Sequence, residues 1–483
     1  MQYGFRVVTS LVLSAAVLAL AGCNVPPPLA SAPLPAAPAQ ADAALLAGEG
    51  AAFPADAWWQ TWRDPALDAL IAEALQGSPD MAVAAARVRA ADAVAAQSGG
   101  ALQPRAQIDA SLGGTKQSEN MGIPPLFVPK GVLDTGKLAL SLGLDLDLWG
   151  KNRARLAAAR GEALAARADA AQARLLLASG VALAWGDLAR IEASRKVAAE
   201  TLAADRQIET LTAQRQSRGL DNQADLALTT ARRAGAERAL AALDEAGAMV
   251  RNRIAALLGT GPGRAEQLPQ PAPDLGQSVG VPDALAASLV ARRPDLAAAR
   301  LRTEAAAQRV KAARAAFFPD INLAGVVGLQ ALGIDKLIEG SSSFANFGPA
   351  LSLPLFTGGQ LQGQHQGALA GYDEAVARYN QTLVSAFHEV ADALTQKRAS
   401  AMQLAQARTA MAAADQAARL TRLRYDQGLA NLLQVLAAED SARASRQAVA
   451  EQALRAFQSD VLLVKALGGG YAAPAPAGEN NKP

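Results

Sequence analysis

The side chains that most often perform catalysis are few in this sequence of 483 residues. His365 and His388 are the only histidines, and they lie 23 residues apart in a segment expected to be helical. Two residues that bind one metal ion from a single helix stand three or four positions apart, so this spacing predicts no metal site. Neighbouring acids such as Glu439 and Asp440 point to different sides of a helix and are expected to be solvated. We therefore predict no catalytic residues, no cofactor and no enzyme.

The single cysteine, Cys23, has a context that indicates covalent lipid attachment. It follows an apolar run of about 15 residues, which is too short to span a bilayer and has the length of a signal-peptide core. The sequence LAGC over residues 20–23 resembles the bacterial lipobox, in which the cysteine becomes the lipidated first residue of the mature chain. We predict a signal peptide over residues 1–22 and a lipidated flexible tether over 23–57, with Asn24 favouring the outer membrane. The alternative is an ordinary cleaved signal in which Cys23 has no role.

The charges of the chain are nearly balanced, with 46 lysines and arginines against 44 aspartates and glutamates. A protein that holds nucleic acid through its phosphates needs a surplus of positive charge. The balance therefore argues against a nucleic-acid partner. With one cysteine, the chain also has no intramolecular disulfide to stabilise it.

Two long helical segments dominate the second half of the chain and have counterparts in the first half. Residues 358–467 contain no proline and are rich in strong helix formers, which predicts helix. The pattern breaks around Gly428, as it does around Gly219 within residues 150–259, and we call these two breaks the seams. The segments are offset by 209 residues at seam and end, which indicates an internal duplication. We predict a first repeat over 58–262, a linker over 263–281, a second repeat over 282–468 and a disordered tail over 469–483.

Each repeat also contains a pair of predicted strands. Residues 138–148 place leucine at every second position with small or acidic residues between, which is the period of a strand with one apolar face. No spare helix follows to cover this face, whereas lipid could cover it, and its length suits a tilted membrane-spanning strand. On this interpretation Asp145 and Asp147 line a wet barrel interior. Three weaker strands are predicted over residues 107–115, 321–330 and 344–356.

A membrane location has a consequence for the number of chains. Four strands cannot close a barrel, and an open sheet edge cannot persist in a bilayer, so several chains must share one barrel. The predicted fold class is mainly α with a transmembrane β-barrel, each protomer giving four strands and long antiparallel helices. Periodicity alone leaves open whether the helices form a solid bundle or a tube. A lipid-anchored periplasmic coiled-coil scaffold without a pore is an alternative, although a scaffold has no use for the alternating leucines.

Short motifs are distributed over nearly all of the mature chain. They are WW at 58–59, DPAL at 64–67, LDLWGK at 146–151, RRPD at 292–295, FFPD at 317–320, LPLFTGG at 353–359 and YDQG at 425–428. Each motif alone is weak, whereas their order and duplication are specific. In these motifs the chain resembles the outer membrane factor family of bacterial tripartite efflux systems, which is the TolC-like or OprM-like family, and most closely its NodT-type lipoprotein branch.

The resemblance implies a homotrimer with a 12-stranded barrel and a helical tube that crosses the periplasm. It implies that this duct passively conducts small molecules, such as drugs or toxic organic compounds. A periplasmic adaptor, an inner-membrane pump and outer-membrane lipid are the implied partners. A duct for type I protein secretion is the alternative within the channel class, and the lipobox favours small-molecule export.

The resemblance also implies a periplasmic gate at the seams, near Gly219 and Gly428. Tyr425 matches a tyrosine that helps to close the gate in relatives, and Asp225 matches the aspartate that follows the first seam. Arg218 lies directly beside the first seam and is included in the predicted gate.

The second seam departs from the family's pattern. Gln434 and Ala437 stand at the positions where relatives carry aspartates. Rings of carboxylates set cation preference, so this departure argues against strong cation selectivity at the gate. The alternative function of Tyr425 is that of a packed aromatic at a helix end, and for Asp225 it is that of a carboxylate at a helix N-terminus.

Overall fold

The computed structural model describes residues 50–118, 120, 124–272, 277–282 and 292–472. Cys23, the predicted signal peptide and most of the predicted tether and tail lie outside these residues. Within the described part of the chain, no helix is both long and apolar enough to cross a membrane.

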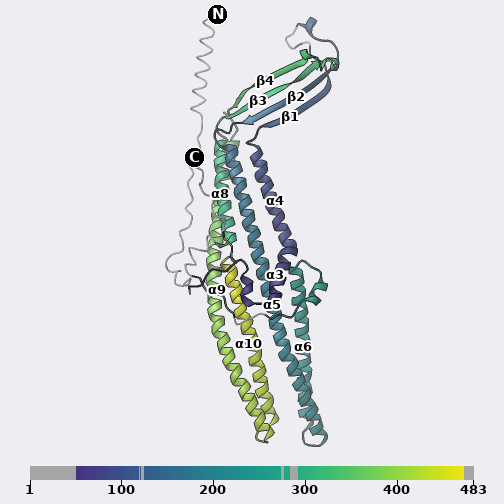
Figure 1. Ribbon diagram of the computed structural model, residues 1–483, viewed down its shortest axis with the longest axis vertical. Helices are drawn as coiled ribbons and strands as arrows, with labels where there is room; N and C mark the ends of the chain where they lie inside the picture. Colours follow the sequence, from purple (N-terminus) through teal and green to yellow (C-terminus); the bar gives the residue numbers. More distant parts are fainter. Residues whose placement is uncertain (1–49, 119, 121–123, 273–276, 283–291, 473–483) are drawn as a thin grey trace. The chain divides into compact units, whose positions relative to one another are not determined.

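From α4 and again from α8 onward, helices and strands follow the same order along the chain (Figure 1). The first series is α3 (Pro65–Gly77), α4 (Pro79–Gly100), β1 (Arg105–Thr115), β2 (Leu133–Asp145), α5 (Lys151–Ser217) and α6 (Gln223–Leu257). The second series is α8 (Pro294–Ala315), β3 (Asp320–Leu332), β4 (Ser343–Ser352), α9 (Gln360–Asp426) and α10 (Leu432–Ala466). Both α5 and α9 contain 67 residues, and both α6 and α10 contain 35. These equal lengths agree with the predicted internal duplication.

The structure divides into two compact units, and each unit draws on both halves of the chain. One unit contains residues 88–165 and 299–379, and therefore the strands. The other unit contains the described parts of 35–87, 166–298 and 380–483. The units consequently do not coincide with the two sequence repeats, because elements of one repeat pack against elements of the other.

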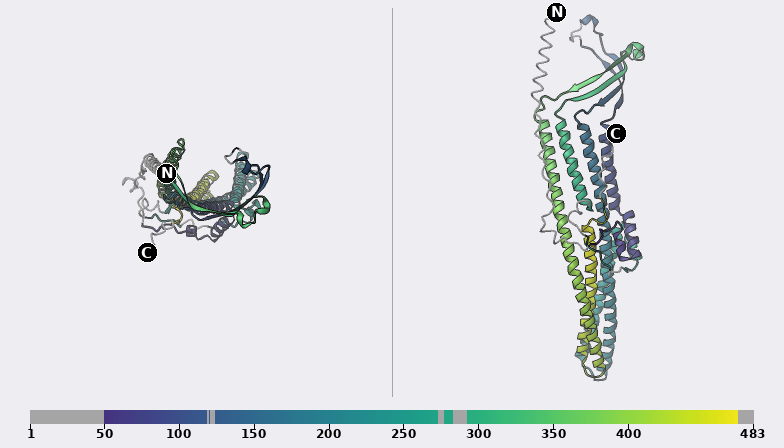
Figure 2. Two further views of the ribbon diagram at one scale, coloured as in Figure 1. Left: turned by 90° about the horizontal axis from the view of Figure 1, so that it is seen from above. Right: turned by 60° about the vertical axis from the view of Figure 1, so that its left-hand side comes forward.

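The first unit contains one antiparallel sheet with the strand order β1-β2-β3-β4, and Figure 2 shows its curvature. Leu140 of β2 pairs with Ile108 of β1 on one side and with Val327 of β3 on the other. The two middle strands thus come from different repeats. Among the described residues, no further strand lies beside β1 or β4, so both edges present unpaired backbone groups.

All four predicted strands are present, but two of them end earlier than predicted. The strand expected over 138–148 is β2, which ends at Asp145 because Asp147 adopts a left-handed φ of 44° and turns the chain toward α5. The strand expected over 344–356 is β4, which ends at Ser352. Pro354 follows shortly after and has no N–H group for a sheet ladder.

The second unit packs its helices around a tryptophan-rich core. The 3-10 helix η1 (Trp58–Trp62) places Trp62 with its ring centroid 4.6 Å from that of Phe457 in α10. Asp64 caps α3 by accepting from the N–H of Ala66, and it accepts a second hydrogen bond of 2.7 Å from the Trp185 indole of α5. Other buried members of this core are Leu67, Leu70, Ile71, Val181, Leu188, Leu454, Val461 and Val464. The WW and DPAL motifs therefore fix η1 and α3 against α5 and α10.

Candidate functional site

Both long helices end in the same glycine-centred turn, and these turns lie at the same end of the helical unit (Figures 1 and 2). Gly219 and Gly428 have φ angles of 74° and 76°, in the left-handed region that glycine adopts without strain. The N–H of the leucine after each glycine donates to the carbonyl five residues earlier, on Arg215 at 2.9 Å and on Arg424 at 2.7 Å. This is the Schellman ending of a helix. The predicted seams are therefore tight helix-to-helix turns.

A matching capping box follows each seam. Before α6, the Asn222 side chain accepts from the N–H of Asp225 at 2.9 Å, and the Asp225 carboxylate accepts from the N–H of Asn222 at 3.4 Å. Before α10, Asn431 and Gln434 make the same two bonds at 2.9 and 3.2 Å. Asp225 and Gln434 thus occupy equivalent cap positions, one charged and one neutral. Helix capping is a sufficient structural reason for both side chains at these positions. Their role in a gate stays a prediction.

Tyr425 lies half-buried in the last turn of α9, and Arg218 is exposed just after the end of α5. Arg215, in the last turn of α5, donates hydrogen bonds of 2.9 and 3.1 Å to Asp221. These bonds and the Asp221 charge raise the pKa of Arg215, and Tyr425 adds a smaller contribution in the same direction. The phenol of the second seam is therefore within electrostatic range of a guanidinium of the first. The sequence analysis did not identify Arg215. The one feature of the sequence that could have indicated it is Asp221, an acidic residue six positions later on the other side of the Gly219 turn.

An ion-pair network joins the two helical hairpins. Arg232 of α6 donates to both carboxylate oxygens of Asp440 of α10 at 2.7 and 2.8 Å. The buried Asp205 of α5 lies 3.5 Å from Arg232 and 3.7 Å from Arg443 of α10. Arg443 also pairs with Glu439 at 3.1 Å, one helical turn away. That last pair could be read from the i, i+4 spacing, whereas the links between helices required the tertiary structure.

One face of the sheet is apolar and uncovered on all four strands. Leu138, Leu140 and Leu142 of β2 are each 37 to 49% exposed. The register places further exposed apolar residues on the same face, namely Ile108, Leu112, Leu323, Val327, Phe347 and Leu351. Contiguous apolar surface of this extent needs an apolar partner, because its exposure to water is unfavourable.

The opposite face of the sheet carries polar side chains. Asp109 of β1 accepts hydrogen bonds from Gln107 at 2.7 Å and from Ser141 of β2 at 3.3 Å. Lys137 lies over the ring of Phe344 of β4, 5.9 Å from its centroid. The sheet therefore has one face suited to lipid and one suited to water, as in the wall of a membrane pore.

Asp145 and Asp147 lie at the junction of β2 and α5 and build the turn between them. The Asp147 carboxylate is only 4% exposed and accepts from the N–H groups of Asn152 at 2.8 Å and Arg153 at 2.9 Å. Asp145 accepts from the N–H of Asp147 at 2.9 Å and from the Asn152 amide at 2.7 Å. The prediction that Asp147 lines a wet interior is therefore wrong, because this carboxylate is buried and caps α5. The Asp145 carboxylate is engaged in the same turn.

The LDLWGK and FFPD motifs meet at this junction. Lys151 pairs with both carboxylate oxygens of Asp320 at 2.5 and 2.6 Å. The Trp149 indole donates to the carbonyl of Pro319 at 2.9 Å and stacks on Phe318 at 4.8 Å between centroids. These contacts fix the start of α5 to the start of β3.

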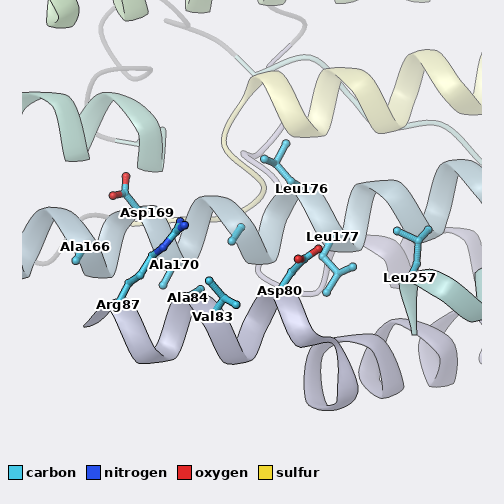
Figure 3. Close-up of a pocket in the computed structure, with 11 residues that line it drawn as sticks. Asp80, Val83, Ala84, Arg87, Ala166, Asp169, Ala170, Leu176, Leu177 and Leu257 are labelled. Atoms are coloured by element: carbon cyan, nitrogen blue, oxygen red, sulfur yellow. The ribbon is translucent and has the colours of Figure 1, made fainter. Parts of the chain in front are cut away.

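A pocket of about 430 Å³ lies in the helical unit between the start of α4, the first half of α5 and the end of α6 (Figure 3). Small and apolar residues line most of it, with Asp80, Arg87 and Asp169 as its charged members. Its lining offers no serine, cysteine or histidine as a nucleophile or base. Across the described parts of the chain, no group of acids, histidines and cysteines is arranged to hold a metal ion.

Comparison with known proteins gives consistent results. Residues 70–260 and 285–469 each match the family described as Outer membrane efflux protein. The multidrug resistance outer membrane protein MdtP of Shigella flexneri is 32% identical over 453 residues, covering 90% of each chain. The toluene efflux pump outer membrane protein TtgF of Pseudomonas putida is 33% identical over 479 residues, covering 94% of this chain and 95% of TtgF.

A solved structure shares the fold as well as the sequence. The outer membrane protein VceC of Vibrio cholerae superimposes with a TM-score of 0.80 at 38% sequence identity. The match covers 86% of this chain and 100% of VceC.

Proposed function

Since this chain belongs to the Outer membrane efflux protein family and is an outer-membrane efflux channel, we propose that it passively conducts small organic molecules such as drugs or solvents. Channels of this family act as trimers with an adaptor and an inner-membrane pump, and the family is one of channels rather than enzymes. The proposed substrate class is supported by the names of the relatives, which refer to multidrug resistance and to toluene.

One observation carries the proposal, namely the four-stranded sheet with an apolar face, a polar face and two free edges among the described residues. In a trimer, β1 of one protomer would pair with β4 of the next, which would satisfy every edge and close the barrel. The apolar face would then meet lipid, and the polar face would line the pore.

The seams are the proposed periplasmic gate, with Tyr425, Arg218, Asp225 and Gln434 as its residues. Support comes from the shared end of the two turns and from the proximity of Tyr425 to Arg215. Because Gln434 is neutral, each protomer would bring Asp225 without a second carboxylate at the equivalent cap. We therefore expect weak cation selectivity and weak block by multivalent cations.

Lipid attachment at Cys23 is also proposed, from the LAGC sequence alone. The Cys23→Ser variant should lose metabolic labelling by palmitate while the unmodified chain is labelled. Continued labelling of the variant would show that the lipid is attached elsewhere.

Assembly and conduction can be tested on the detergent-extracted, full-length protein. Light scattering should give a mass of three chains, and the same particles should produce discrete conductance steps in planar bilayers. Monomeric particles that conduct no current would refute the channel and favour the periplasmic scaffold.

A further inference from the structure

The connection between β3 and β4 folds into a short amphipathic turn at the end of the sheet remote from α5 and α9 (Figure 1). It contains the 3-10 helices η4 (Ile334–Lys336) and η5 (Gly340–Ser342). Ile334, Leu337 and Ile338 have the i, i+3, i+4 spacing that places side chains on one side of a helical turn. The charged residues Asp335, Lys336 and Glu339 fall between and after them.

The apolar side of this turn continues the apolar face of the sheet. A Cβ atom built on Gly136 of β2 would lie 2.9 Å from Leu337 and 3.4 Å from Leu112. Gly136 lies two residues before Leu138 in β2, so it belongs to the same face of the sheet as Leu138 and Leu140. Leu337 therefore packs on the apolar face at the end next to the β3–β4 connection. Ile338 extends beyond it and is 86% exposed.

The backbone of the turn satisfies much of its own hydrogen bonding. Asp134 of β2 accepts from the N–H of Gly333 through its carbonyl at 2.8 Å and from that of Ile334 through its carboxylate at 3.0 Å. The N–H groups of Leu337 and Glu339 donate to the carbonyls of Ile334 and Lys336 at 3.1 and 3.0 Å. A backbone that is paired internally can enter a region poor in water, whereas an open loop cannot.

We propose that residues 333–342 insert their apolar side into the acyl–headgroup boundary of the outer leaflet, with Ile334 and Ile338 among the acyl chains and Lys336 and Glu339 in water. A lipid surface is the fitting partner because the patch is continuous with the sheet face that would contact lipid. A second copy of the chain would instead pair with the edge strands β1 and β4. Those edges run along the sides of the sheet and not across this tip. The inference rests on the proposed membrane position of the sheet.

Nitroxide labels on single introduced cysteines test this insertion in nanodiscs of phosphatidylcholine and phosphatidylglycerol. The full-length variants are Ile338→Cys and Lys336→Cys, which lie on opposite sides of the same turn, and Leu140→Cys at the middle of β2. Unsubstituted protein treated with the same label reports any background from Cys23. The measured quantity is the ratio of collision with oxygen, which concentrates in lipid, to collision with a water-soluble nickel chelate.

The ratio at position 338 should be several-fold higher than at 336 and should approach that at 140. Equal, water-like ratios at 338 and 336 with a lipid-like ratio at 140 would overturn the insertion and leave the channel intact. Water-like ratios at all three positions would overturn the membrane position of the sheet itself, and the insertion with it.

Discussion

Arg215 and Tyr425 lie in different halves of the chain, yet each occupies the last turn of a 67-residue helix before a glycine turn. Tyr425 makes a small contribution to the raised pKa of Arg215, which indicates that the two seams lie near each other. Asp225 and Gln434, by contrast, mainly bond within their own helix starts. Individual side chains at the seams thus divide into those that cap a helix and those that can link one hairpin to the other.

Replacement of Tyr425 tests the link between the hairpins. Tyr425→Phe keeps the ring but removes the hydroxyl group of the proposed gate residue, so we expect a several-fold rise in current through the closed channel. Basal conductance in planar bilayers and uptake of a bulky antibiotic by cells measure this leak. Tyr372→Phe, on the same helix but in the sheet-bearing unit, is the control and should leave both unchanged. An unaltered Tyr425→Phe channel would remove this residue from the gate.

The Arg232–Asp440 bridge makes stability depend on pH in a defined direction. The hydrogen bonds from Arg232 hold the pKa of Asp440 below its ordinary value of about 3.9. A lowered folded pKa means that the bridge stabilises the protein above that ordinary value and that the contribution is lost as the pH falls through the folded pKa. Because the Asp440 side chain is 51% exposed, solvent screening limits the contribution to below about 1 kcal/mol.

Thermal unfolding midpoints of the wild type and Asp440→Asn, measured from neutral to acid pH, check this direction. The variant should be less stable near pH 7, and the two curves should converge at acid pH. Arg232→Gln provides the matched partner, since the double variant should be hardly less stable than Arg232→Gln alone. Parallel curves at all pH values would contradict a stabilising bridge.

At the scale of elements, the seams depend on glycine at one position each. Gly428 has a φ of 76° and no atom within 4 Å of an added Cβ, so Gly428→Ala meets strain without collision. A left-handed alanine costs about 1 kcal/mol. Gly235, inside α6, also has open space around it but lies in ordinary helix. Gly235→Ala should therefore stabilise the protein by about 0.5–1 kcal/mol.

Far-UV circular dichroism melts of these two variants should shift in opposite directions. Equal shifts would show that the turn at Gly428 does not require the left-handed conformation. The comparison uses the same substitution twice, so it isolates backbone strain from the change in side-chain volume.

At the scale of the whole molecule, assembly in the membrane depends on which face of β2 receives a charge. Leu140→Arg places a cation on the apolar face, where arginine near the middle of a bilayer costs about 2–4 kcal/mol. Ser141→Arg places it on the polar face beside Asp109, where water and that carboxylate can accommodate it. We expect trimers in outer-membrane fractions to fall strongly for the first variant and to persist for the second. Similar trimer yields for both would show that the leucine face does not meet lipid.

The sequence by itself determined the elements and their duplication. Proline-free, alanine-rich segments dictate long helices, the glycines at 219 and 428 end them, and alternating leucines dictate a strand with one apolar face. These are local properties, since they follow from backbone preferences and from the period of side chains along one element. The family motifs were readable for the same reason.

The tertiary structure alone decided which elements meet. Pairing of β2 with β3, the Arg232–Asp440 bridge and the contact of Lys151 with Asp320 join residues far apart in the chain, and nothing in their local sequence selects the partner. Asp147 shows most clearly what local sequence patterns could not predict. It continues the alternating pattern of β2, but its left-handed φ and its buried hydrogen bonds make it the cap of α5, because the helix that follows offers unpaired N–H groups that a carboxylate satisfies.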